Sequence, residues 1–370
     1  MKNQTTALPT VYTITAGDLG SIFASSGVRS NGLSPYPQMV AESDKTSSVE
    51  LQRLMASPDG PIITRLLQAP DLRIRCHAGG GMAQEEVYYL LLSASTSAVV
   101  AQFTDSEGRL KLLLFADWSG FLNWRISLYG TSDTHSYREI FPGSQDLETL
   151  VCACHGLDLY RRASLESMLR YEAGRPISIS PRDFILGLKE AIVKGDNRWL
   201  LPSLINLTPG LRTHKLVLEP QHLKILEELG FIQPAENGAG ETLTLGTLGI
   251  TLGIEFAATW MGSVGFEAVA LVNGQKAVLD RKILMPTAFT NHLISLEPEP
   301  DGLKFQHQAL DSSHINTLLD QWLGYLKKIA FATAVPQTEP PQAAHFCHHC
   351  GAPLKAGRKF CTKCGTPVEH

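Results

Sequence analysis

The feature that most constrains this chain is a pattern in residues 98–130 that returns 168 positions later, in residues 266–298. The identical positions, aligned without a gap, are Phe121 and Phe289, Asn123 and Asn291, Ile126 and Ile294, Ser127 and Ser295, and Leu128 and Leu296. Other features recur in the same order. The alternating run 12–18 resembles 177–183, and helical patterns at 157–170 and 315–328 close the two copies. Recurrence in order at nearly one offset predicts a duplicated structural unit.

The duplication predicts an α+β fold built from two tandem copies of one unit, each an antiparallel meander flanked by helices. We expect the first copy to span residues 1–174 and the second to span 175–332. At about 160 residues, each copy is long enough to bury its own hydrophobic core.

Local signals place the elements within each copy. Thr15 and Ser180 are side chains suited to cap the helices that follow them, and Asn273-Gly274 is a strong two-residue hairpin signal. The expected helices are 16–24, 49–56, 61–68, 181–194 and 221–229. The expected strands are 11–15, 72–76, 87–93, 98–103, 110–115, 242–245, 256–260, 268–272 and 277–279. The spacing in residues 121–129 fits a strand or a helix equally well.

Composition describes an ordinary globular protein, with 44% hydrophobic and 18% charged residues and a net charge of −4. The N-terminus lacks the apolar core of a signal peptide, and no run of eighteen apolar residues occurs, so we expect a cytoplasmic protein without a membrane span. The mildly acidic body argues against nucleic acid as its ligand, because phosphate contacts need clustered Lys and Arg. The oligomeric state is open.

A metal-binding spacing stands at the end of the chain. Residues 333–344 are rich in Pro and Gln and predict an extended linker. In the tail that follows, residues 345–370, the pairs Cys347/Cys350 and Cys361/Cys364 each have the spacing Cys-x-x-Cys. Four thiolates in two such pairs suit a tetrahedral Zn²⁺ or iron ion and leave no ligand position open for water. The sequence therefore predicts a structural metal site, with neighbouring His345, His348 and His349 exposed.

The tail resembles the short bacterial zinc-ribbon modules. Each Cys pair is followed by glycine, and Gly357-Arg-Lys-Phe360 precedes the second pair, as in that family. The resemblance implies structural Zn²⁺ on Cys347, Cys350, Cys361 and Cys364. It also implies a small basic surface that could bind a protein or an acidic ligand, which leaves nucleic acid open for the ribbon.

The body of the chain holds few residues that indicate catalysis or ligand binding. The candidate groups are Cys76 and His77 before Gly79–Gly81, then Cys152, Cys154 and His155, then Asp117 and Trp118, and then Asp133 and His135. No phosphate-binding or dinucleotide-binding glycine motif accompanies them, and the Cys152 segment is apolar enough to predict inert, buried thiols. The aligned Asn123 and Asn291 suit turns or caps. We therefore expect no catalytic residues.

The arrangement of the body resembles the EspG-type chaperones of type VII secretion systems. The resemblance rests on two tandem α+β copies over residues 10–330, each opening with a capped helix. It implies a cytoplasmic protein without catalytic activity, which binds a helical export substrate. We predict a protein-binding adaptor or chaperone-like protein. The alternatives are an enzyme with its site between the copies, and a winged-helix transcriptional regulator, since a helix and a hairpin follow one another in residues 223–245.

Overall fold

The computed structural model describes the greater part of the body of the chain. The described residues are 9–34, 36, 48–78, 85–90, 98–127, 140–172, 177–196, 198–207, 216–235, 242–257, 263–287, 290–299 and 302–333. They form an α+β protein, as predicted. Residues 334–370, which hold nearly all of the predicted linker and the whole metal-binding tail, lie outside the described part.

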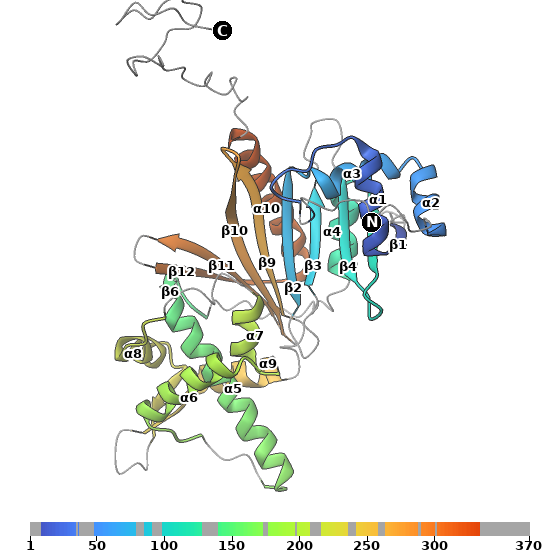
Figure 1. Ribbon diagram of the computed structural model, residues 1–370. Helices are drawn as coiled ribbons and strands as arrows, with labels where there is room; N and C mark the ends of the chain where they lie inside the picture. Colours follow the sequence, from blue (N-terminus) through green and yellow to red (C-terminus); the bar gives the residue numbers. More distant parts are fainter. Residues whose placement is uncertain are drawn as a thin grey trace, which may run out of the picture.

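One large antiparallel sheet organises the molecule, in the order β1-β5-β4-β3-β2-β9-β10-β11-β12-β6 (Figure 1). Its strands are β1 (Thr10–Ile14), β2 (Leu72–Ala78), β3 (Glu85–Leu90), β4 (Val99–Thr104), β5 (Leu110–Phe115), β6 (Ser144–Asp146), β9 (Val264–Val272), β10 (Gln275–Pro286), β11 (Asn291–Glu299) and β12 (Gly302–Leu310). The predicted Asn273-Gly274 turn joins β9 to β10. Both residues have positive φ, at 51° and 77°, as a two-residue hairpin turn of type I′ requires.

The strand order is symmetrical about the central antiparallel pair of β2 and β9, in which Leu72 faces Ala270. Outward from this pair, the first arm reads β2, β3, β4, β5 and β1, and the second arm reads β9, β10, β11, β12 and β6. Each arm therefore consists of a four-strand meander and a fifth, outermost strand that precedes the meander in the sequence. This order favours a duplication, which stays a prediction.

Helices cover both faces of the sheet. On one face, α4 (Trp118–Ser127) and α10 (Ser312–Thr333) each follow the meander of their own arm and pack in one shared core. On the other face, the first arm carries α1 (Ala16–Ser26), α2 (Val49–Ala56) and α3 (Gly60–Gln68). The second arm carries a helical unit there, visible at one end of Figure 1, whose core continues onto Ile283, Ile294 and Phe305 of the sheet.

The helical unit contains α5 (Leu147–Leu169), α6 (Pro181–Lys194), α7 (Leu200–Leu207), α8 (Pro220–Glu228), the hairpin β7 (Ile232–Pro234) and β8 (Leu243–Leu245), and α9 (Thr247–Ala257). Ile179 bridges Leu243 through two backbone hydrogen bonds of 3.0 and 2.8 Å. An extended segment, three helices and a hairpin thus follow one another, with the first segment beside the hairpin. Within residues 223–245 a helix is followed by a hairpin, which is the order that the sequence predicted, and α5 and α9 flank this group.

Helix starts follow the predicted caps. The Thr15 side chain accepts a 3.2 Å hydrogen bond from the Asp18 backbone N–H, and the Asp18 carboxylate accepts a 2.9 Å bond from the Thr15 N–H. Ser180 accepts a 3.0 Å bond from the Asp183 N–H. Because each cap satisfies a backbone donor that the first helical turn leaves open, both helices begin at the predicted residues.

Three details of the predicted repeat are corrected. Asn123 and Ile126 lie in helix α4, whereas the aligned Asn291 and Ile294 lie in strand β11. The predicted strand 256–260 is wrong at Phe256, which ends up near the end of helix α9. The run 12–18 crosses from β1 into α1 at the edge of the sheet, whereas 177–183 leads into α6 of the helical unit. Apolar spacing matched without regard to helical or strand geometry produced these errors.

The sheet also crosses the predicted boundary between residues 174 and 175. Strand β6, before that boundary, pairs with β12, so Phe305 faces Gln145. By strand order, residues 10–127 and 144–333 would be the two related segments. The limits 1–174 and 175–332 stay a prediction. Among the described residues, no helix is both long enough and apolar enough to span a bilayer.

Candidate functional site

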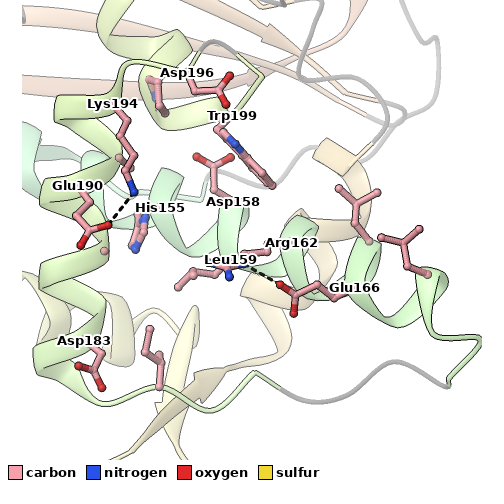
Figure 2. A pocket seen from close by; sticks show the side chains of 16 residues that line it. His155, Asp158, Leu159, Arg162, Glu166, Asp183, Glu190, Lys194, Asp196 and Trp199 are labelled. Carbon is pink, nitrogen blue, oxygen red and sulfur yellow. Dashed lines mark hydrogen bonds and ion pairs between the residues drawn. The ribbon is translucent and has the colours of Figure 1, made fainter.

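A groove with a volume of about 560 Å³ lies between α5 and α6 (Figure 2). It is lined by His155, Asp158, Leu159, Arg162, Leu165, Glu166 and Leu169 of α5, by Asp183, Gly187, Glu190, Ala191 and Lys194 of α6, and by Ile179, Asp196, Trp199 and Pro202. On each helix the lining residues recur every three or four positions. One face of each helix therefore forms a wall.

Helices α5 and α6 come close together where Gly187 lies beside His155. A side chain on Gly187 would stand 3.3 Å from Nε2 of His155, so the missing side chain leaves room for the imidazole. The His155 ring packs on the Phe184 ring in an edge-to-face arrangement, with ring centroids 4.8 Å apart. Burial lowers the pKa of His155 to about 4, partly opposed by the Phe184 backbone. His155 is therefore neutral near pH 7 and serves mainly to pack α5 against α6.

Asp158 lies one turn after His155 on α5 and caps the start of helix α7. Its carboxylate accepts hydrogen bonds of 2.6 and 2.9 Å from the backbone N–H groups of Leu200 and Leu201, in the first turn of α7. Burial raises the pKa of Asp158 to about 6, against the lowering effect of these bonds and of Arg161. Both carboxylate oxygens are thus engaged in holding α7 to α5.

The charged residues at the rim are paired with close sequence neighbours. Arg162 lies 2.9 Å from Glu166 on α5, and Lys194 lies 2.9 Å from Glu190 on α6. Asp196 lies 2.7 Å from Arg198, which lowers the pKa of its carboxyl to about 2. Because these pairs lie at the surface, they contribute little to folding stability. They set the charge pattern that an approaching molecule meets.

The walls between these charges are apolar and open towards the end of α5. Leu165 is 40% exposed and Leu169 is 80% exposed, on the part of α5 that extends beyond the other helices (Figure 1). The sequence predicted a helix at 157–170, so the spacing of these leucines was visible. Their exposure was missed, because nothing local distinguishes a buried leucine stripe from an exposed one.

The predicted thiol candidates are buried. Cys76 is fully buried on β2, accepts a 3.0 Å hydrogen bond from Arg125 and has its pKa raised to about 11 by burial. Burial likewise raises the pKa of Cys152 to about 12 and that of Cys154 still higher. These thiols stay protonated near pH 7 and are not nucleophiles. The burial of Cys152 and Cys154 agrees with the inert role predicted for these two thiols.

Those of the remaining predicted residues that the structure describes do not form a common site. His77 lies half-buried on β2 and Asn123 is exposed on α4, whereas Asn291 is buried on β11. Asp117 accepts a 2.7 Å bond from the Gly120 N–H at the start of α4, where Trp118 is buried. Gly79–Gly81, Asp133 and His135 lie outside the described residues.

A buried ion pair lies under α4 in the first arm. Arg125 stands 3.2 Å from Glu86, and both side chains are less than a tenth exposed. The Tyr88 hydroxyl also donates to the Glu86 carboxylate. Because the same guanidinium reaches Cys76, it connects α4 to β2 and β3. The cluster is enclosed and serves the fold.

A second buried polar cluster lies where α9 meets the sheet. The Ile140 N–H donates to Nδ1 of His307 over 3.2 Å, so Nε2 of the neutral His307 carries the proton and donates to Nδ1 of His292 over 3.0 Å. His292 then directs Nε2 towards Glu255, 3.7 Å away. Burial and the neighbouring His292 lower the pKa of His307 to about 3. This chain of groups ties the helical unit to β11 and β12.

Two other kinds of site find no support in the described residues. Nowhere in them do three or more His, Cys, Asp or Glu side chains gather as metal ligands would. In the described residues of 216–245, Lys224 is the sole Lys or Arg, and it pairs with Glu228 at 3.9 Å on α8. This surface lacks the clustered positive charge that phosphate contacts need.

The tail carries its own evidence. Its four thiols, Cys347, Cys350, Cys361 and Cys364, lie outside the described residues, as do His345, His348 and His349. Their type and number fit the donor set of tetrahedral Zn²⁺. A search among curated proteins finds none that matches this chain. Residues 346–368 match the family model of the zinc-ribbon domain, so the chain carries a zinc ribbon at its C-terminal end.

Proposed function

We propose that this protein is an adaptor without catalytic activity, which binds a helix of another polypeptide in the groove between α5 and α6. The observation that carries the proposal is the open, apolar end of that groove. Leu169 and Leu165 lie there on a helix whose inner half is almost entirely buried. Such a leucine stripe beside a second helix wall suits helix-in-groove recognition.

The dimensions of the groove support a helical occupant. The α5 wall runs from His155 to Leu169, about 21 Å at 1.5 Å per residue, and the α6 wall runs from Asp183 to Lys194, about 17 Å. An occupant of three to four turns would match these walls. Gly187 and Ala191 keep the α6 wall low, which allows close approach of a helix.

The zinc ribbon supports the adaptor role as a second contact. In the proposal, Cys347, Cys350, Cys361 and Cys364 hold a structural Zn²⁺, which supplies folding free energy to a segment with few apolar residues. Lys355, Arg358, Lys359 and Lys363 give this segment positive charge. The ribbon would bind a second partner surface, and the linker at 333–344 would separate the two contacts.

The enzyme alternative rests on His155 and Asp158, whose pKa values are both displaced next to a groove. The contacts of these residues argue against acid–base work. Both oxygens of Asp158 accept backbone hydrogen bonds, and His155 is 5% exposed. Neither side chain lies beside a Ser, Thr or Cys that lines the groove. Helix packing accounts for both displaced pKa values.

Site-specific photo-crosslinking in cells tests the proposal. Leu169 is replaced by p-benzoyl-phenylalanine, and the matched control is Val193, which is 85% exposed on α6 but does not line the groove. We expect protein adducts from position 169 that mass spectrometry identifies as one or a few polypeptides, and far fewer from position 193. Equal, diffuse labelling from both positions, or none from 169, would contradict the adaptor function of the groove.

A further inference from the structure

The charge pattern of α5 identifies the polypeptide that fits its exposed face. We infer that the helix received there is α5 of a second copy of this chain, packed antiparallel about a twofold axis at the level of residue 164. The inference rests on the proposed function, since it names the occupant of that groove. It depends on the order of leucines and charges along one helix face, seen in Figure 2 from Leu159 to Glu166.

Residues equally distant from position 164 face each other in such a pair. Leu159 of one copy then meets Leu169 of the other, and Arg162 meets Glu166. Leu165 lies next to the axis, about 3 Å along the helix from its symmetry mate. The stripe is therefore complementary to its own reversed copy, which is what a twofold interface requires.

The charged residues within the stripe agree with this arrangement. The Arg162 and Glu166 side chains are 67% and 52% exposed and already 2.9 Å apart within one chain. In the pair they form a cluster of four alternating charges. Such a cluster specifies register more than it adds affinity.

The same pattern discriminates against other occupants. A uniformly basic helix would bring like charge to Arg162, and a uniformly acidic helix would bring like charge to Glu166. A helix with the opposite order of charges satisfies both, and reversed α5 has that order. Because the contact involves one helix and its flanking groove, we expect a dimer at the weak end of specific interfaces, with Kd on the order of micromolar.

Sedimentation velocity of the full-length, zinc-loaded protein tests the inference by charge exchange. We expect concentration-dependent dimerisation of the unmodified chain between about 1 and 200 μM. R162E and E166R should each weaken the dimer by at least about tenfold, because each places like charges opposite one another. The double variant R162E/E166R should return Kd to within about threefold of the unmodified value. All four side chains of the pair are exposed, so the fold should stay intact, as circular dichroism can verify.

The matched control is the exchange K224E/E228K on α8, another exposed pair four residues apart. It should leave Kd unchanged. A chain that stays monomeric at about 200 μM, a double variant as weak as the single ones, or an equal effect of the control would overturn the α5 dimer. If the chain is monomeric while position 169 crosslinks to a different protein, the dimer falls and the adaptor function stands. Absence of specific crosslinks from position 169 removes both.

Discussion

The two arms of the sheet share a plan and differ in what covers them. In each arm a meander of four strands is followed by a helix on the same face, α4 in the first and α10 in the second. The opposite face is closed by the short helices α1 to α3 in the first arm. In the second arm the same position holds α5 to α9, which form the helical unit with its groove. The candidate site thus lies where the second arm departs from the first.

The two arms also differ in where their buried polar clusters lie. The first arm holds its polar cluster, Glu86 and Arg125, beneath α4 inside the arm. The second arm holds His292 and His307 between the sheet and the helical unit. Buried polar contacts hold helix α4 to the strands of the first arm. In the second arm they attach the helical unit to the sheet. The sheet therefore acts as a scaffold whose arms could diverge separately.

The largest expected effect is loss of the first arm's ion pair. R125M leaves the Glu86 carboxylate buried without its guanidinium partner, so we expect a loss of about 3 to 5 kcal/mol in the free energy of unfolding. Urea denaturation measures it. The double variant E86Q/R125M should recover much of the loss, because the uncompensated charge is gone. If R125M costs less than about 1 kcal/mol, the buried pair does not lock the first arm.

The second-largest expected effect is a loss of stability of the second arm at acidic pH. The folded pKa of His307 is about 3, below the 6.5 of an unfolded histidine, so the unfolded chain binds the proton first. This contribution to stability is present above about pH 6.5 and is lost as the pH falls towards 3. Between pH 7 and pH 4 the loss is on the order of 3 kcal/mol.

Urea unfolding of the unmodified chain and of H307Q between pH 7 and 4 isolates that contribution. The variant should lose less stability than the unmodified chain over this range. Asp158 acts in the opposite direction, because its pKa of about 6 is raised above the ordinary 3.8. Its contribution is present at low pH and is lost as the pH rises through this interval. The difference between the two proteins cancels it. Parallel pH profiles would show that the histidine pair does not attach the helical unit.

Helix capping should give smaller and separable effects in the two arms. T15A and S180A each remove a side chain that accepts a backbone hydrogen bond at a helix start, so each should cost about 1 kcal/mol. By hydrogen exchange, T15A should loosen α1 in the first arm, and S180A should loosen α6 at the groove. Conservative controls are T15S and S180T. Loosening of both helices by either variant would contradict the independence of the arms.

The smallest expected effect on the body comes from removing the metal. In C347S/C350S we expect the bound zinc, measured by elemental analysis, to fall from about one ion per chain to near zero. The unfolding temperature of the body should change by less than about 1 °C, because the body has its own cores. A fall of many degrees would show that the ribbon packs on one of the arms.

Much of the local structure was predictable from short patterns. Helices α2 and α6 begin and end at the predicted residues, and the caps at Thr15 and Ser180 explain two starts. The Asn273-Gly274 turn was predictable because few residue pairs tolerate positive φ twice. The helix at 118–127 was left open, since its apolar residues fit either period.

The groove was less accessible from sequence. A helix over 157–170 was predicted, and it holds Leu159, Arg162, Glu166 and Leu169 at helical spacing. Their role depends on α6 crossing α5 at Gly187 and then leaving the distal leucines uncovered. The pairing of β6 with β12, which carries the sheet across the predicted domain boundary, is likewise a contact between distant residues.

Residue spacing fixed what depends on neighbours in the chain. It determined the Cys-x-x-Cys pairs of the zinc ribbon, the capped helix starts and the type I′ turn, because ligand geometry, capping and backbone dihedrals are local. Tertiary structure decided the symmetry about β2 and β9, the burial of Cys76 and His307, and the exposure of Leu169. These properties depend on which distant parts of the chain cover a side chain and exclude water from it. The spacing of apolar residues does not identify those distant parts.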